Sequence, residues 1–451
     1  MTAVDSAVST AADHPNGDTD VDVLVVGAGQ AGLGTGYWLA RRSNLSFLVV
    51  DGAERVGDSW RRRWDSLELF TPRRFSSLPG TPMPRGPGEY ASKDETADYL
   101  AAYAGSQGLP VRLRTRILTL EQDGTGGFVA DTTTGCVRAR HVVVASGPYS
   151  TPFIPDTADG LDPSVAQLHS SAYRHPGDLP GKDVLVVGAG NSAAQLAVEL
   201  AATRRVTVAA PGGMWFLPAR VLGLSLYWWL WLTGILNGPS GSRVSRMVRA
   251  RGDGIIGRDL QSVVAAGTVR MVKERVCSAR GSAVVLADGT EVRTDAVLWC
   301  TGYQPDYGWL RVPLALDENG HPVHDAGRSP VRGLHWVGLP WQTRLNSGII
   351  DGVDRDARQA IRRMKAEPAP FRGGEAPTSP ARPQIAPNAP GPPQQQRTQR
   401  VSDNQSRPTP ETPTSKQLRD ARRQAHEAQK KSTADKGGGM KGKKGKGKRK
   451  P

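Results

Sequence analysis

Two glycine-rich turns have the residue types and the spacing that bind the pyrophosphate of a dinucleotide. The first reads G-x-G-x-x-G over residues 27–32, and the second reads G-x-G-x-x-A over residues 188–193. In such turns the first glycine allows a sharp bend, the second lets the backbone approach the phosphates, and the third small residue lets helix and strand pack closely. In the first turn we assign binding to Gly27, Gly29, Gln30, Ala31 and Gly32. In the second turn we assign it to Gly188, Gly190, Asn191, Ser192 and Ala193.

Each turn must be positioned by a strand before it and a helix after it. The same seven residues, VLVVGAG, lead into both turns, at 23–29 and at 184–190. Such an apolar run predicts a buried parallel strand, and a run with helical spacing follows each turn. The sequence therefore predicts an α/β fold with two Rossmann-type dinucleotide-binding domains. Another helix is expected after Ser92, because Glu95 three residues later completes a capping box.

The residues downstream of the two turns differ in a way that distinguishes the cofactors. Asp51 ends the run SFLVVD, where an acid is expected to bind a ribose hydroxyl. The corresponding run of the second unit, RVTVAAPGG, ends without an acid, and Arg204 and Arg205 precede it. These arginines could meet the 2′-phosphate of NADPH, or they could form a solvated helix end. We therefore expect FAD at the first turn and NADPH at the second, in a shared cleft where hydride donor and flavin can meet.

The positive charge of the chain is concentrated at its C-terminal end. From Glu367 to Pro451 there are 19 Lys and Arg against 7 Asp and Glu, so +12 of the net charge of +15 lies there. The composition predicts a disordered tail over residues 366–451, Pro-rich and then Lys-rich, and a disordered lead over residues 1–20. No specific nucleic acid is predicted as a partner. The tail is expected to be a solubilising segment, with a weak contact to anionic surfaces as the alternative.

The cysteines and histidines exclude several other kinds of site. The three cysteines, Cys136, Cys277 and Cys300, form no C-x-x-C pair, which argues against a disulfide framework, an iron–sulfur site and a redox-active pair. They suit the reducing cytoplasm, and the N-terminus has no signal peptide pattern. No Ser-His-Asp set and no closely spaced metal ligands are found. We therefore predict a cytoplasmic protein with neither catalytic side chains nor a metal ion.

Further motifs carry a family resemblance. Residues 56–60, VGDSW, stand where flavin-containing monooxygenases have a G-G-x-W element near FAD, and Ala145-Ser146-Gly147 looks like their A-T-G element. Residues 300–303 look like a second such element, and GLHWVGLPWQTR resembles a closing segment that contacts FAD. The sequence thus resembles this family, in particular single-chain bacterial members and plant indole-3-pyruvate monooxygenases. The resemblance adds these cofactor-binding residues: Gly57, Ser59, Trp60, Gly147, Gly302 and Gly338.

The resemblance covers residues 21–364 and implies an organisation and an activity. The FAD domain would comprise residues 21–150 and 299–365, with the NAD(P)H domain, residues 151–298, inserted between them. NADPH would reduce FAD, and a C4a-peroxyflavin formed with O2 would transfer one oxygen to a small nucleophilic or carbonyl substrate. His169 and Tyr173 match part of the family fingerprint, and we expect them to be structural or to lie at the domain junction.

Two departures from the family keep other functions open. The fingerprint has Phe and Gly where this chain has Pro163 and Val165, and Thr71-Pro72 stands where family members have an Asn at the flavin–oxygen site. One alternative is a reductase that passes hydride from NADPH through FAD to an acceptor without oxygenation. Another is a weakly active flavoprotein whose binding role is set by its tail.

One apolar segment requires a separate interpretation. Residues 221–236 contain no charge over 16 residues, which is shorter than the roughly 20 that span a bilayer. Gly223 and Gly234 interrupt the segment. We expect it to pack near the mouth of the substrate site. Interfacial membrane contact through its Trp and Tyr side chains and a buried core helix are the alternatives.

Overall fold

The fold was analysed in a computed structural model that describes residues 17–252 and 254–367. The predicted tail lies outside the described residues from 368 onward, as does the predicted lead up to residue 16. The predicted extent of the lead was wrong at its end, because the first strand already begins at Thr19. The capping box at Ser92 is confirmed: its side chain accepts from the Glu95 N–H, and the Glu95 carboxylate accepts from the Ser92 N–H.

The first sheet has seven strands in the order β5-β2-β1-β8-β7-β6, with β23 pairing β8. Its strands are β1 (Thr19–Val26), β2 (Phe47–Val50), β5 (Val111–Arg112), β6 (Ile117–Gln122), β7 (Phe128–Thr132), β8 (Gly135–Val144) and β23 (Leu334–Trp336). The apolar run before the first turn forms β1, which pairs in parallel with β2 and β8. β23 also pairs in parallel with β8, although it comes from much later in the chain.

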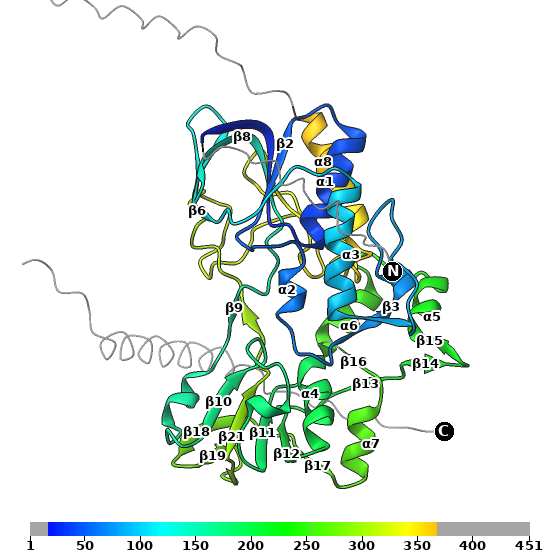
Figure 1. The fold of residues 1–451 in the computed structure, drawn as a ribbon, viewed down its shortest axis with the longest axis vertical. Helices are drawn as coiled ribbons and strands as arrows, with labels where there is room; N and C mark the ends of the chain where they lie inside the picture. Colours follow the sequence, from blue (N-terminus) through cyan, green and yellow to red (C-terminus); the bar gives the residue numbers. More distant parts are fainter. Residues whose placement is uncertain (1–16, 253, 368–451) are drawn as a thin grey trace, which may run out of the picture. The chain divides into compact units, whose positions relative to one another are not determined.

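Three helices cover one face of this sheet (Figure 1). They are α1 (Gln30–Arg42), α3 (Lys93–Ser106) and α8 (Val353–Ala366). Their buried side chains, among them Leu33, Leu100 and Ile361, form one apolar core with Val23 and Val143 of the strands. The other face of the sheet packs against a second apolar core, which includes Tyr307 and Leu310. The last described helix, α8, thus packs on the same sheet as the first strand, β1.

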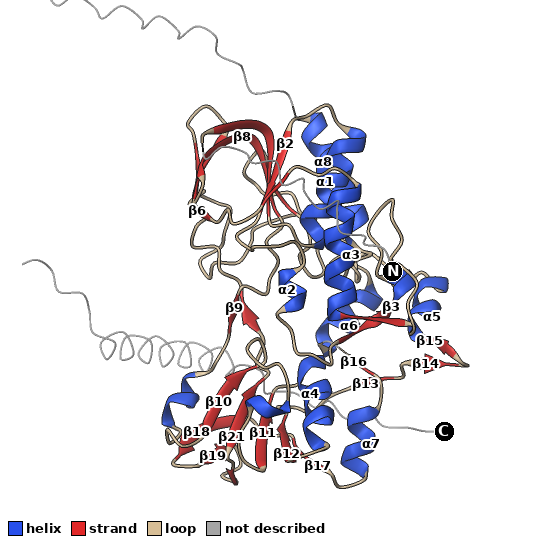
Figure 2. Ribbon diagram, in the orientation of Figure 1, coloured by secondary structure: helices blue, strands red, loops and turns tan. Residues whose placement is uncertain are grey.

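The second sheet has five parallel strands in the order β10-β21-β11-β12-β17. They are β10 (Ala166–His169), β11 (Asp183–Val187), β12 (Arg205–Ala209), β17 (Val269–Val272) and β21 (Ala296–Trp299). Helices α4 (Asn191–Ala201) and α7 (Asp259–Ala265) pack on one face (Figure 2). An antiparallel sheet packs on the other face: β18 (Val276–Arg280), β19 (Ala283–Leu286) and β20 (Glu291–Arg293).

Smaller elements complete the described part of the chain. The connections between the sheets, β9 (Thr151–Pro152) and β22 (Tyr303–Gln304), pair with each other. The remaining strands form pairs: β3 (Glu68–Pro72) with β4 (Tyr90–Ser92), β13 (Phe216–Leu217) with β16 (Ile255–Ile256), and β14 (Arg220–Val221) with β15 (Leu224–Ser225). The remaining helices are α2 (Asp58–Arg61), α5 (Leu226–Leu232) and α6 (Arg243–Arg251), with short 3-10 turns at Arg73–Phe75, Asp156–Gly160 and Pro176–Asp178.

Candidate dinucleotide sites

The carboxyl ends of four parallel strands meet at one edge of the first sheet. β1 is followed directly by Gly27, β2 by Asp51, β8 by the turn that contains Gly147, and β23 by the turn that contains Gly338. Gly27 has a φ of +106°, and a Cβ there would lie 2.7 Å from the Ala145 carbonyl oxygen. The structure therefore brings together predicted residues from three distant segments at the edge where parallel sheets bind ligands.

The first turn has the space that a pyrophosphate needs. A Cβ on Gly32 would lie 1.8 Å from the Gly27 carbonyl oxygen, so only glycine allows this approach of α1 to the turn. Gly29 is the N-cap of α1, and a Cβ there would meet no atom within 4 Å. No side chain caps α1, which leaves its first N–H groups facing open space. An uncapped helix N-terminus beside an open backbone fits a diphosphate.

Asp51 holds the turn in place. Its Oδ2 accepts a hydrogen bond from the Ala28 N–H at 2.6 Å, and its Oδ1 accepts one from the Ala53 N–H at 2.8 Å. Each carboxylate oxygen has a second lone pair, so Asp51 can also accept from a ribose hydroxyl. The structure thus gives Asp51 a role in the turn that sequence spacing alone does not show.

The VGDSW segment begins α2. Gly57 has a φ of +88°, and a Cβ there would lie 2.6 Å from the Ala97 carbonyl oxygen, so Gly57 is required for α2 to pack on α3. Ser59 is exposed on α2. Trp60 packs against the cores of both sheets. Trp64 and Leu67, which follow it, are buried in the core of the second sheet. This segment therefore joins the two predicted domains.

The second turn repeats the geometry at the carboxyl edge of the second sheet. Gly188 has a φ of +148°, and a Cβ there would lie 2.3 Å from the Cys300 carbonyl oxygen. Gly190 is the N-cap of α4, which no side chain caps, and a Cβ there would meet nothing within 4 Å. Ala193 is fully buried behind the turn. Gly302, in the turn after β21, also has a positive φ, of +84°.

Asn191 has a structural partner in addition to its predicted role. Its side chain accepts from the Ile256 N–H at 3.1 Å and donates to the Gly254 carbonyl oxygen at 3.2 Å. These bonds attach β16 to the start of α4. Ser192 is half-buried in the first turn of that helix. Asn191 thus positions the backbone N–H groups around it.

The prediction for Arg204 and Arg205 was wrong. Arg205 begins β12 and pairs in register with Asp183, the first residue of β11, whereas the glycine turn follows the last residue of β11. The two arginines therefore lie at the amino edge of the sheet, and the turn lies at the carboxyl edge. Arg205 forms an ion pair with Asp183, and Arg204 donates to the Pro176 and Leu179 carbonyl oxygens at 3.3 Å.

Another cation lies at the correct edge. Lys273 follows β17, which pairs with β12 so that Val272 lies beside Ala209. Its carbonyl oxygen accepts from the Gly212 N–H at 3.0 Å, and its side chain extends past Gly213. Lys273 thus stands where the second strand of a dinucleotide-binding unit ends. This position of Lys273 could not be predicted from the sequence, because the strand that pairs with β12 comes some 60 residues further along the chain.

Three side chains meet where the two sheets are connected. The His169 Nε2 lies 3.0 Å from the Gly302 carbonyl oxygen, and its ring packs edge-on against Tyr303. The Arg63 guanidinium lies over the Tyr303 ring and donates to the Tyr303 hydroxyl. Burial lowers the pKa of His169, so the imidazole is neutral near pH 7. His169 therefore lies at the junction, as predicted, and Tyr173 is fully buried with its hydroxyl 3.2 Å from Glu199.

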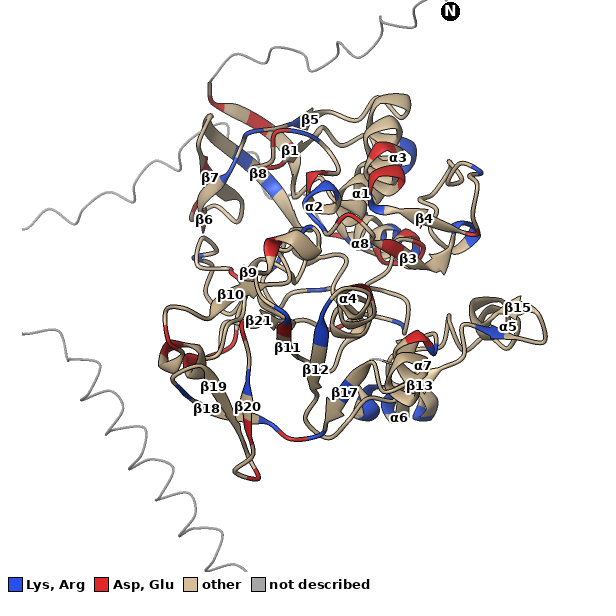
Figure 3. Ribbon diagram, turned by 60° about the horizontal axis from the view of Figure 1, so that its bottom comes forward, with Lys and Arg blue, Asp and Glu red and all other residues tan. Residues whose placement is uncertain are grey.

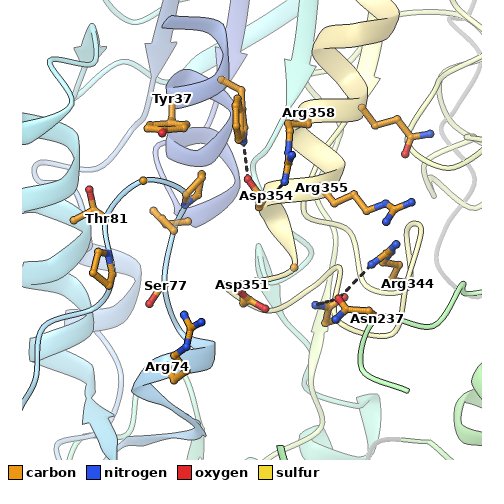
Figure 4. Close-up of a pocket in the computed structure, with 18 of the residues that line it drawn as sticks. Tyr37, Arg74, Ser77, Thr81, Asn237, Arg344, Asp351, Asp354, Arg355 and Arg358 are labelled. Atoms are coloured by element: carbon orange, nitrogen blue, oxygen red, sulfur yellow. Dashed lines mark hydrogen bonds and ion pairs between the residues drawn. The ribbon is translucent and has the colours of Figure 1, made fainter. Parts of the chain in front are cut away.

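A pocket of about 1210 Å³ lies between α1, residues 77–82 and α8 (Figure 4). Beside it, α1 approaches α8 closely at Gly34, where a Cβ would lie 2.8 Å from the Val353 Cγ1. Asp354 accepts from the Trp38 indole N–H at 2.8 Å and pairs with Arg358. Burial and the neighbouring Asp354 raise the pKa of Asp351. The charged side chains of the wall are Arg74, Arg344, Arg355, Arg358, Arg362, Asp351 and Asp354.

Comparison with known proteins agrees with this geometry. The model of the pyridine nucleotide-disulphide oxidoreductase family matches residues 24–221. An uncharacterized CzcO-like oxidoreductase of Geobacillus kaustophilus is 42% identical over 76% of this chain and 97% of its own. The indole-3-pyruvate monooxygenase YUCCA4 of Oryza sativa subsp. japonica is 29% identical over 79% of this chain and 91% of its own.

A solved structure decides the family. The flavin-containing monooxygenase from Stenotrophomonas maltophilia is 30% identical, has a TM-score of 0.65 and aligns over 77% of this chain and 99% of its own. The chain belongs to the flavin-containing monooxygenase family. This confirms the predicted fold class, the FAD-dependent oxidoreductase activity and the pairing of FAD with a nicotinamide cofactor. The three cysteines of the chain, all among the described residues, are free.

The apolar segment 221–236 forms the β14–β15 hairpin and α5 rather than one long helix. Tyr227 and Leu236 are buried against Phe75, and Asn237 lines the pocket, so the segment packs beside the pocket wall. Its outer surface is apolar and exposed; the exposed side chains are Leu222, Leu224, Trp228, Trp231 and Leu232. The next helix along the chain, α6, is rich in arginine (Figure 3). Among the described residues, no helix has the length and apolar character needed to cross a bilayer.

The exposed side chains motivate a test of interfacial membrane contact, one of the two alternatives for this segment. Exposed Trp and Leu are typical of surfaces that enter a lipid interface. Replacing Leu222, Trp231 and Leu232 together by serine should lower flotation with phosphatidylglycerol vesicles by about tenfold. Leu118→Ser, at an exposed position on β6, is the matched control. Equal flotation of the wild type and the triple variant would refute the contact.

Proposed function

We propose that the protein is an NADPH-using monooxygenase that transfers one oxygen atom from O2 to a small substrate. The observation that supports this most directly is the segment 60–67: Trp60 packs against the cores of both sheets, and Trp64 and Leu67 are buried in the core of the nicotinamide sheet. The two glycine-bearing edges are thereby attached to one junction, where the hydride donor and the flavin must meet. Bound FAD would supply hydride acceptance and reaction with O2.

The chain itself would bind, orient and shield the reacting groups. The uncapped starts of α1 and α4 would each hold a pyrophosphate, and the open space at Gly29 and Gly190 admits it. The Arg63–Tyr303–His169 cluster would fix the two connecting strands, so that the nicotinamide edge keeps its distance from the flavin edge. The proposed reaction needs no acid or base side chain of the chain itself, because the bound cofactors would supply the redox chemistry.

The charge of the pocket favours an anionic carbonyl substrate. Arginines outnumber aspartates on its wall, and Arg74, Arg355 and Arg362 have no ion-pair partner among the described residues. Arginine is well suited to bind a carboxylate through two parallel hydrogen bonds. Among the substrate classes that suit the family, a 2-keto acid therefore fits this pocket better than a neutral ketone or amine. The name of the YUCCA4 relative, an indole-3-pyruvate monooxygenase, is in line with this choice.

The proposed activity is tested by the fate of O2 during NADPH oxidation. The holoenzyme is supplied with NADPH and either phenylpyruvate or its neutral methyl ester, and NADPH consumption and hydrogen peroxide are quantified. We expect the keto acid to lower the peroxide released per NADPH and the ester to have little effect. Full conversion of NADPH to peroxide with both compounds would contradict keto-acid oxygenation.

Lys273 would select NADPH over NADH. A charge-assisted hydrogen bond to the 2′-phosphate contributes about 1.5 kcal/mol or more, so Lys273→Gln should raise KM for NADPH by about tenfold. KM for NADH should stay unchanged, because NADH has no 2′-phosphate. Arg205→Gln is the control, since Arg205 lies at the opposite edge. An equal rise of both KM values, or a larger effect of the control, would exclude this role.

One observation favours a reductase as the second candidate. Thr71 is buried, and its hydroxyl lies 2.7 Å from the Ser76 hydroxyl, so no amide is presented where relatives of this family have one. A reductase would pass hydride from NADPH to an external acceptor without oxygenation. Without that acceptor, the electrons would go to O2, and peroxide would equal the NADPH oxidised whichever carbonyl compound was present.

A further inference from the structure

Two imidazoles and one carboxylate meet inside the first sheet rather than at its carboxyl edge. One ligand-capable atom from each of His141, His335 and Glu367 lies within 4.8 Å of the other two. The His141 Nδ1 and the Glu367 Oε2 are 3.7 Å apart. This group was not predictable from spacing along the chain, because its members come from β8, from β23 and from the residue after α8.

Strand register explains why the side chains converge. His335 pairs with Val143, and side chains alternate along a strand, so His335, Val143 and His141 all face the same side of the sheet. Val143 packs in the core that includes Met364 of α8. Both imidazoles therefore face α8. Glu367 is placed at the end of that helix by hydrogen bonds from its N–H to the Arg363 and Met364 carbonyl oxygens.

The polar atoms of this group lack ordinary partners. His335 is fully buried and His141 is 5% exposed. Neither ring nitrogen of His335, nor the His141 Nδ1, nor the Glu367 Oε2 has a hydrogen-bond partner among the described residues. A buried polar atom without a partner is destabilising, so three such side chains facing one another favour a common ligand. Burial lowers the pKa of His335 to about 3 and that of His141 to about 4, so both rings are neutral near pH 7.

We propose that His141, His335 and Glu367 bind a divalent transition-metal ion, of which zinc is the best fit, with water as a fourth ligand. Two imidazoles and a carboxylate are a ligand set that zinc accepts at about 2.0–2.2 Å in tetrahedral geometry. Ligand atoms in that geometry are about 3.4 Å apart, so small side-chain rotations would complete the site. The ion would attach the end of α8 to β8 and β23.

The types of ligand, together with the surrounding positive charge, predict which metal ions bind. Arg140, Arg328, Arg332 and Arg363 lie close enough to lower the pKa of the two imidazoles, and they repel any cation. Arg140 is partly neutralised by Asp22, 3.3 Å away. Mg²⁺ and Ca²⁺ depend on several anionic oxygens, which this site does not offer. Zinc, copper and nickel bind imidazole strongly, so we expect these ions to bind and Mg²⁺ and Ca²⁺ to be rejected.

Equilibrium dialysis of the full-length, untagged protein against zinc chloride tests the site. After chelator treatment and desalting, the wild type should bind one zinc ion per chain with this site, and Glu367→Gln should weaken binding by roughly tenfold or more. Glu367 lies at a helix end, so this variant should fold, which circular dichroism and retained FAD would verify. His321→Ala removes an exposed imidazole elsewhere and should leave the stoichiometry unchanged.

Cobalt substitution separates this site from binding by the cysteines. Cobalt bound by two imidazoles and a carboxylate should show visible d–d absorption without the ultraviolet thiolate charge-transfer band. The site is excluded if the wild type binds no zinc, if Glu367→Gln binds as tightly as the wild type, or if the cobalt spectrum shows thiolate ligation. These outcomes are independent of the oxygenase activity.

Discussion

Gly29→Ala should strongly weaken FAD binding while leaving the fold intact. The Gly29 φ is −76°, which alanine adopts freely, and a Cβ there meets no protein atom within 4 Å. The added methyl would instead occupy the space beside the uncapped N-terminus of α1 that we assign to the FAD pyrophosphate. We expect FAD affinity to fall by about 100-fold, the upper range of an overpacking penalty. The ratio of flavin to protein absorbance after purification measures this loss.

A matched alanine substitution controls for nonspecific effects. Gly105 lies in α3, where a Cβ also meets no atom within 4 Å, so Gly105→Ala should retain FAD and slightly stabilise the helix. Gly32→Ala should instead damage the turn itself, because its Cβ would lie 1.8 Å from a carbonyl oxygen. Full FAD occupancy in Gly29→Ala would remove the first turn from the FAD site.

Gly190→Ala should retain FAD but lose reduction by NADPH. Its φ of −96° suits alanine, and a Cβ there is also free of protein contacts. The methyl would obstruct the pyrophosphate at the start of α4, so the NADPH concentration for half-maximal flavin reduction should rise by about 100-fold. Anaerobic stopped-flow measurement of flavin bleaching gives this value.

Dithionite provides the internal control for this variant. It reduces flavin without using the second turn, so Gly190→Ala and the wild type should bleach alike with dithionite. If NADPH reduces the variant as readily as the wild type, then NADPH does not bind at the second turn. If both reductants fail, the substitution has disturbed the flavin site, and the two sheets are coupled more closely than we infer.

Local patterns in the sequence predicted the parts of the fold that depend on neighbouring residues. The strand, turn and helix of each Rossmann unit are encoded within about 30 residues, and the capping box at Ser92 within four. The backbone requirements at Gly27 and Gly32 follow from the same local pattern. These features were predictable because their energetics are decided by contacts close in sequence.

Features that depend on strand order were not predictable in the same way. The prediction for Arg204 and Arg205 failed because they lie at the start of β12, and only the parallel register shows that this end lies away from the turn. Lys273 reaches the carboxyl edge only because β17 pairs with β12. His141, His335 and Glu367 meet only because β23 inserts beside β8 and α8 packs over both. Such long-range pairings are set by the packing of the whole sheet.

The most direct test of the proposed oxygenase is one stopped-flow experiment with two mixing steps. FAD-loaded protein is first reduced anaerobically by NADPH and is then mixed with oxygenated buffer while the flavin spectrum is recorded. We expect rapid bleaching, followed by a transient absorbance that belongs to neither reduced nor oxidised flavin. This transient should decay faster when phenylpyruvate is present. Direct return to the oxidised spectrum without a transient, with stoichiometric peroxide whatever the added carbonyl compound, would contradict it and leave the reductase.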